Sequence, residues 1–138
     1  MIRIMMGEKG TGKTGALIQL ANDALDTEKG KVVCINRGSR FTFDLKHPVR
    51  LIDTDQFEIR TLDIFLGFIE GVIAHDFDVT HIFIDSVLKC AKGSLDDMDS
   101  FLARIEAISE KFNIDFTMTI SAPVSQASEA MKKYLVSF

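Results

Sequence analysis

The chain has 138 residues, of which 46% are hydrophobic and 26% are charged, and its formal net charge is −4. This length fits one domain, residues 1–138, and the apolar fraction is high enough to build a core, which argues against disorder. The acidic balance argues against nonspecific nucleic-acid binding, which requires a net basic face.

The chain shows no sign of export, membrane insertion or a metal site. Its apolar runs are too short to span a bilayer and no signal pattern precedes the first of them, so we expect a cytoplasmic protein without membrane association. The two cysteines, Cys34 and Cys90, do not indicate a disulfide framework. The histidines, His47, His75 and His81, lack the spacing of metal ligands, and we expect structural roles for them.

Short apolar runs alternate with helical patterns along the chain. Strands are expected at Ile2–Met6, Val32–Asn36, His81–Asp85 and Phe116–Ser121, with Val49–Asp53 as a weaker edge strand and Tyr134–Phe138 as a sixth strand or a helix end. These runs are apolar on both faces, as strands covered by helices on both sides are.

Helical stripes lie between the expected strands. They run over Leu17–Leu25, Leu62–Ile73 and Met98–Phe112, and a shorter helix is expected over Gln126–Leu135. Gly30 supplies a stop after the first helix, and the third is expected to open at Ser94 with Asp97 in a capping box. Gly67 and Gly71 lie one turn apart in the second helix and suggest close packing there.

This alternation predicts an α/β fold, a three-layer sandwich with a mainly parallel sheet of about five strands. Right-handed crossovers place the helices on both faces, and ligands of such sheets bind at the carboxyl ends of the strands. Asn36–Arg40, Asp85 and Ser121 follow strands, as does the segment after Met6. We therefore expect these residues to meet at one edge.

The segment after the first strand, GEKGTGKT, matches the phosphate-binding pattern G-x-x-x-x-G-K-[ST] in full. Its glycines let backbone N–H groups face a phosphate, and the helix that begins near Lys13 adds the positive end of its dipole. The expected nucleotide-binding residues are Gly7, Glu8, Lys9, Gly10, Thr11, Gly12, Lys13, Thr14 and Gly15. The alternative is a glycine-rich turn without a ligand.

Three of these residues carry specific expectations. Lys13 is expected to reach the β- and γ-phosphates, and the Thr14 hydroxyl to ligate Mg²⁺. Asp85, which ends the run HIFID, is the second expected magnesium residue, and its alternative role is that of a cap or turn. The Glu8 carboxylate would repel phosphate, so we expect it to point outward.

In order and spacing, GEKGTGKT, HIFIDS and FTMTISAPVSQ resemble the core of the RecA-like P-loop ATPases, over nearly the whole chain. The resemblance implies ATP and Mg²⁺ as cofactors and catalytic roles for Lys13, Asp85 and Ser121. It places Ser121 at the end of the strand between the two motif strands, where it would sense the γ-phosphate or its attacking water. A strand-end serine with satisfied hydrogen bonds is the alternative.

The chain also resembles small bacterial P-loop proteins of unsettled function, some of which are labelled twitching-motility ATPases. Pilus motors of that kind are far longer and carry an additional N-terminal domain with further acidic and histidine motifs. Neither feature is found in this sequence, so we do not adopt that label.

The sequence departs from the RecA-like pattern at the catalytic base. The positions that would hold a catalytic glutamate carry Ser86 and Asn36, and neither side chain is a general base near neutral pH. Acidic residues that could swing in instead are Asp44, Asp53, Asp55 and Glu58. The sequence therefore predicts nucleotide binding with weak or partner-stimulated hydrolysis, and it leaves open whether the chain is an enzyme.

The chain is also too short for the DNA-contacting loops of ring helicases. Arg37 and Arg40 lie at the expected active edge, where they could contact nucleotide or a partner or remain a solvated loop. The lysines Lys89, Lys92, Lys132 and Lys133 are interpreted as scattered rather than as a nucleic-acid patch.

Three functions remain. The first is a nucleotide-dependent switch or assembly subunit with an unidentified protein partner. The second is a small nucleoside or metabolite kinase, whose lid would be Arg37–Pro48. The third is a non-enzymatic interaction module that nucleotide stabilises. The sequence fixes neither the base nor the oligomeric state.

Overall fold

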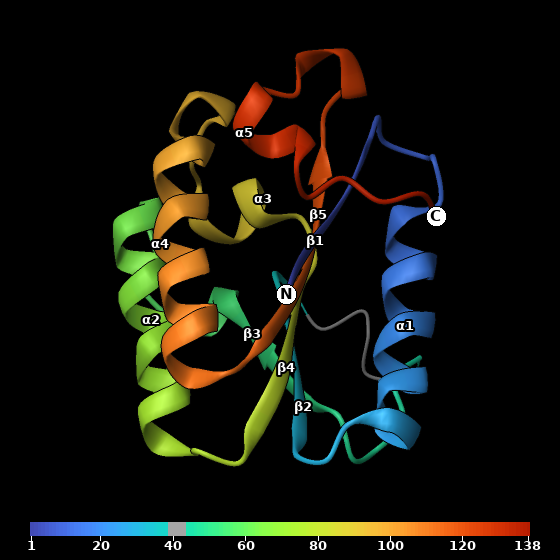
Figure 1. Ribbon diagram of the computed structural model, residues 1–138, viewed down its shortest axis with the longest axis vertical. Helices are drawn as coiled ribbons and strands as arrows, with labels where there is room; N and C mark the ends of the chain where they lie inside the picture. The colour runs from blue at the N-terminus through green and yellow to red at the C-terminus, as the bar shows by residue number, and fades with distance from the viewer. Residues whose placement is uncertain (39–43) are drawn as a thin grey trace.

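The computed structural model describes residues 1–38 and 44–138, and it places one sheet between helices on both faces (Figure 1). The strands are β1 (Ile2–Gly7), β2 (Lys31–Asn36), β3 (Arg50–Asp53), β4 (Val79–Ile84) and β5 (Asp115–Ser121). The helices are α1 (Lys13–Thr27), α2 (Leu62–His75), α3 (Val87–Ala91), α4 (Met98–Phe112) and α5 (Glu129–Lys132). Short 3₁₀ turns are η1 (Thr54–Gln56), η2 (Leu95–Asp97) and η3 (Val124–Gln126).

In the described residues the sheet has five strands in the order β1-β5-β4-β2-β3, and each neighbouring pair is parallel. Helix α1 covers one face, and α2 and α4 cover the other (Figure 1). This arrangement confirms the predicted three-layer α/β fold and the edge position of β3. No helix within the described ranges is long and apolar enough to cross a bilayer.

Apolar burial holds the three layers together. On the face covered by α2 and α4, Phe65 and Phe101 are buried and stack with ring centroids 6.1 Å apart. On the face covered by α1, Leu17 packs with Met5 and Phe83, all of them buried. Each such side chain contributes roughly 1.5–3 kcal/mol by leaving water. The carboxyl ends of the strands are thereby fixed relative to one another.

The start of α4 differs from the prediction. The helix begins at Met98, because the residues just before it form η2 instead of a first helical turn. The Ser94 hydroxyl donates to the Asp97 carboxylate at 3.1 Å and caps no backbone N–H, so the predicted capping box is absent. The short helix α3, which directly follows β4 and Asp85, was not predicted.

The C-terminal region also differs. The single helix expected over residues 126–135 is divided into η3 and the four-residue α5. Residues 134–138 form no strand, and only an isolated parallel bridge joins Leu135 to Ile4 of β1. Even so, this segment lies along the free edge of β1.

The glycines of α2 are not at a close packing contact. A Cβ atom added at Gly67 or Gly71 would meet nothing within 4 Å, so the predicted close packing is wrong. Gly30 is different, because an added Cβ would lie 2.1 Å from the Asp78 carbonyl oxygen. Only at Gly30, among these three, does backbone crowding require glycine.

Candidate nucleotide-binding site

The loop between β1 and α1 has the backbone shape that its glycines permit. Gly10 and Gly12 adopt φ of 87° and 90°, in the left-handed region, and Gly12 caps α1 without a side-chain hydrogen bond. The N–H groups of the first helical turn thus have no capping side chain, and such groups bind anions readily. Gly7 is fixed by crowding, since an added Cβ would lie 2.8 Å from Thr11 Oγ1.

Lys13 lies over this loop with its side chain buried. Its exposed fraction is 5%, and Nζ donates to the Glu8 carbonyl oxygen at 2.9 Å and to Thr11 Oγ1 at 3.4 Å. Both acceptors are neutral oxygens, which offset the desolvation of an ammonium group less well than an anion does. The side chain of Glu8 is exposed, as expected for a carboxylate that faces away from the loop.

Asp85 lies directly after β4 and is 1% exposed. Its carboxylate accepts hydrogen bonds from Thr14 Oγ1 at 3.2 Å and from Thr119 Oγ1 at 2.9 Å. The Thr119 hydroxyl in turn accepts from the Ser86 backbone N–H at 2.7 Å. These contacts fix the orientation of a hard oxygen ligand beside a hydroxyl, the kind of pair that Mg²⁺ favours.

Lys13 and Thr14 line one cleft of about 230 Å³, beside the buried Asp85. Its lining residues are Lys9, Gly10, Gly12, Lys13, Thr14, Gly15, Ser86, Lys89 and Ser121. Ser121 is exposed and pairs with Gly7 in the β1–β5 register, and β5 lies between β1 and β4 as the resemblance implied. The structure therefore brings the loop, Asp85 and Ser121 to one edge of the sheet.

Sequence reasoning missed two residues of this site. Thr119 orients Asp85, and the only signal was the alternation of threonines with apolar residues in the run FTMTIS. Lys89 lines the cleft from α3, although it was interpreted as a scattered lysine. Its position four residues after Asp85, close behind the carboxyl end of an expected strand, was the available signal.

Asn36 ends β2 next to Asp85, whose backbone N–H donates to the Ile35 carbonyl oxygen at 2.9 Å. Asn36 is 1% exposed, and both polar atoms of its amide lack a hydrogen-bond partner among the described residues. A buried amide without a partner is costly, on the order of 1–3 kcal/mol per group. A bound water or ligand at this position would supply the missing hydrogen bonds.

The acidic residues considered as substitutes for a catalytic base have other contacts. The Asp53 carboxylate accepts from the Gly38 N–H at 2.7 Å. Asp55 pairs with Arg37 at 2.9 Å, and Glu58 pairs with Arg60 at 2.8 Å.

Asp44 is exposed and its carbonyl oxygen accepts from the Asn22 side chain at 3.1 Å. Arg40 lies outside the described residues, as does part of the expected lid. Asp53 is the register partner of Asn36, but its carboxylate is bonded to the Gly38 N–H, and the position of the catalytic glutamate itself carries the Asn36 amide.

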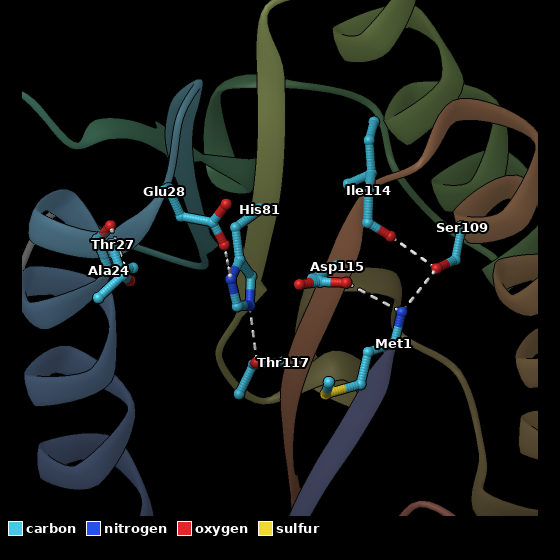
Figure 2. Close-up of polar contacts among 9 residues, drawn as sticks. All are labelled: Met1, Ala24, Thr27, Glu28, His81, Ser109, Ile114, Asp115 and Thr117. Carbon is cyan, nitrogen blue, oxygen red and sulfur yellow. Dashed lines mark hydrogen bonds and ion pairs between the residues drawn. The ribbon is translucent and has the colours of Figure 1, made fainter.

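A second polar group lies at the opposite, amino-terminal edge of the sheet (Figure 2). His81 Nδ1 lies 2.8 Å from Glu28 Oε1, and His81 Nε2 lies 2.8 Å from Thr117 Oγ1. Ligand atoms of Glu28, His81 and Asp115 lie within 4.8 Å of one another, but Asp115 is paired with the N-terminal amine of Met1 at 2.9 Å. Both ring nitrogens are already bonded, which supports the predicted structural role of His81.

Burial determines the protonation of the buried titratable groups away from the cleft. It lowers the pKa of His81, although the Glu28 carboxylate acts in the opposite direction. It raises the pKa of the Cys34 and Cys90 thiols, which are both free and buried. These thiols are therefore protonated and unreactive, as expected for small buried side chains.

Comparison with known proteins identifies the fold. No family model and no curated protein sequence matches the chain. Among solved structures, the chain is similar to the flagellar accessory protein FlaH from Methanocaldococcus jannaschii, with a TM-score of 0.60 and 17% sequence identity. The match covers 96% of this chain and 65% of that protein, so the chain spans less than two thirds of its length. The chain therefore has a RecA-like α/β fold.

Proposed function

We propose that the chain binds ATP and Mg²⁺ between the Gly7–Thr14 loop and Asp85, and acts as a nucleotide-dependent switch or assembly subunit. The observation that carries this proposal is the convergence of three groups at the carboxyl edge of the sheet. Lys13 lies buried over the loop, and the Thr14 hydroxyl lies 3.2 Å from the Asp85 carboxylate. A cation, a hydroxyl and a carboxylate in this arrangement suit a polyphosphate with its magnesium ion.

Each residue would have one task in this complex. The loop N–H groups and the start of α1 would hold the phosphates, while Lys13 would exchange the Glu8 carbonyl oxygen for a phosphate oxygen. Thr14 and Asp85 would hold Mg²⁺, which neutralises charge that develops on the phosphates. Ser121 would contact the terminal phosphate from the end of β5.

The two positions that would carry a catalytic glutamate hold Asn36 and Ser86, and this supports slow hydrolysis. An amide can orient a water but cannot accept its proton. Binding and release of nucleotide would then be the main event, with hydrolysis stimulated by a partner protein. The accessory role named for the M. jannaschii protein is compatible with such a function.

Thermal unfolding with and without ligand tests nucleotide binding. ATP, GTP and ADP with Mg²⁺ at a hundredfold excess over Kd should each stabilise the folded protein by about 2.7 kcal/mol. Lys13→Ala should abolish that gain and remain folded, while the control Lys29→Ala, at an exposed position beyond α1, should keep it. An equal gain for Lys13→Ala and wild type would contradict the assignment of Lys13.

A second candidate function, a small kinase, is favoured by another cavity on the same edge of the sheet. This cavity, of about 250 Å³, is lined by Arg37, Arg60 and Lys92 and by the buried Thr54. The Thr54 hydroxyl has no nitrogen or oxygen partner among the described residues, so a hydroxylated acceptor could bind there. Transfer of labelled phosphate from ATP to a member of a nucleoside panel would establish the kinase and exclude the switch.

A further inference from the structure

The C-terminal segment lies beside the phosphate loop. The Val136 N–H donates to the Ile4 carbonyl oxygen at 2.9 Å, and the Tyr134 carbonyl oxygen accepts from the Ile4 N–H at 2.8 Å. The segment therefore follows the outer edge of β1 toward its carboxyl end. In Figure 1 the C-terminus lies at the end of the molecule where α1 begins.

This path brings the ring of Phe138 to the loop. A Cβ atom added at Gly7 would lie 3.5 Å from Phe138 Cζ, so the ring is in contact range of the last residue of β1. Phe138 is nevertheless 50% exposed, and Val136 in the same segment is 37% exposed. Phe138 thus presents a free aromatic surface beside the start of the loop.

Gly7 pairs with Ser121 of β5 on one flank and has the ring of Phe138 within contact range. On one flank lie β5 and then β4, which contribute Ser121 and Asp85. Terminal phosphates with their magnesium ion would lie on this flank, because Thr14 and Asp85 meet there. A triphosphate whose terminal phosphate lies near Asp85 would extend over the loop, and Phe138 lies on the side of β1 away from β5.

We propose that Phe138 is a stacking platform for the base of the bound nucleotide, an inference that rests on the proposed function. A phenyl ring offers a π-face, which every base can match, and it offers no hydrogen bond that distinguishes one base from another. Phe138 therefore adds affinity for any purine nucleoside triphosphate and discriminates little between ATP and GTP.

Titrations with ATP, GTP and inorganic tripolyphosphate, each with Mg²⁺, separate the base from the phosphates. Phe138→Ala should weaken ATP and GTP binding alike, by about fivefold to 100-fold, and leave tripolyphosphate binding unchanged. Phe138→Trp should retain affinity, and stacking with the base should quench its indole emission. The matched control is Phe77→Ala, which removes a 76% exposed phenyl ring just before β4, at the opposite edge of the sheet.

The outcomes distinguish this inference from the proposed function. Suppose that tripolyphosphate and ATP both bind, and that Phe138→Ala changes neither affinity or weakens both equally. Phe138 then does not stack with the base, and the assignment of the phosphate site is unaffected. Unchanged emission of Phe138→Trp on saturation with ATP would also overturn the platform. If the wild-type protein binds none of the three ligands, the proposed function fails and this inference fails with it.

Discussion

The Thr14 hydroxyl donates to the Asp85 carboxylate across 71 positions of sequence, with Oγ1 lying 3.2 Å from Oδ1 and 3.4 Å from Oδ2. Thr14 lies in the first turn of α1, and Asp85 follows β4, a strand that is not adjacent to β1. The order of the strands, with β5 inserted between β1 and β4, brings the two side chains into contact. This pair is the proposed magnesium site.

Removal of the Thr14 hydroxyl tests that site. Thr14→Ala should lower the affinity for Mg²⁺-ATP by about tenfold or more, because one oxygen ligand of the metal is lost. In EDTA, the variant and the wild-type protein should bind ATP alike. Calorimetric titrations with and without Mg²⁺ measure the ATP affinity under the two conditions. Thr27→Ala, at the exposed end of α1, is the control. An equal loss in EDTA would show that Thr14 acts on the phosphates or on folding.

A carboxylate in place of the Asn36 amide should increase hydrolysis. Asn36→Glu provides a proton acceptor next to Asp85, and a general base typically contributes about 100-fold or more. Asn36→Gln is the matched control, because it has the same length as glutamate and no basic oxygen. Phosphate release at saturating Mg²⁺-ATP is the measurement. No increase in an Asn36→Glu variant that binds ATP normally would show that slow hydrolysis has another cause.

Alanine at the open glycines of α2 should stabilise the fold. An added methyl group at Gly67 or Gly71 meets nothing within 4 Å, so each substitution should raise the free energy of unfolding by about 1 kcal/mol through helix propensity alone. Urea unfolding measures the change. Gly30→Ala is the contrasting variant and should destabilise the protein, because its Cβ would overlap the Asp78 carbonyl oxygen. A loss of stability in Gly67→Ala would mean that this face of α2 packs closely against another group.

His81 should make stability depend on pH. Burial lowers its pKa in the folded protein below the ordinary value of 6.5, so the unfolded chain binds more protons between the two values. The contribution of neutral His81 to the free energy of unfolding is fully present above about pH 6.5. It is lost as the pH falls toward the pKa of His81 in the folded protein, with a slope of at most about 1.4 kcal/mol per pH unit.

Unfolding free energies of wild type and His81→Asn, compared at a series of pH values, measure this contribution. The difference between the two proteins should shrink as the pH falls. The comparison variant His75→Asn removes an exposed imidazole from the last turn of α2 and shows how far a histidine that is not buried affects the profile. A difference for His81→Asn that stays constant between pH 5 and 8 would contradict the account.

The sheet could be predicted because its strands are marked by short runs that are apolar on both faces. The loop could be predicted because GEKGTGKT specifies backbone shape and charge within eight neighbouring residues. The position of Ser121 at the same edge follows from the strand order that the resemblance implied, and the β1–β5 register confirms it.

Other features could not be predicted from local patterns. Helix α3 has five residues, too few to show helical periodicity. The role of Thr119 depends on a contact with Asp85 that only the folded sheet creates. Gly67 and Gly71 carry no signal that distinguishes a tight contact from open space. Phe138 lies at the loop because its segment follows the edge of β1, which the apolar sequence YLVSF alone does not specify.

The most direct test of nucleotide binding is a crystal structure with Mg²⁺ and a non-hydrolysable ATP analogue. The account predicts phosphates in the cleft between the loop and Asp85, with Lys13 Nζ moved from the Glu8 carbonyl oxygen, now 2.9 Å away, to a phosphate oxygen. An analogue bound elsewhere at saturation, with Lys13 still bonded to Glu8, would contradict it.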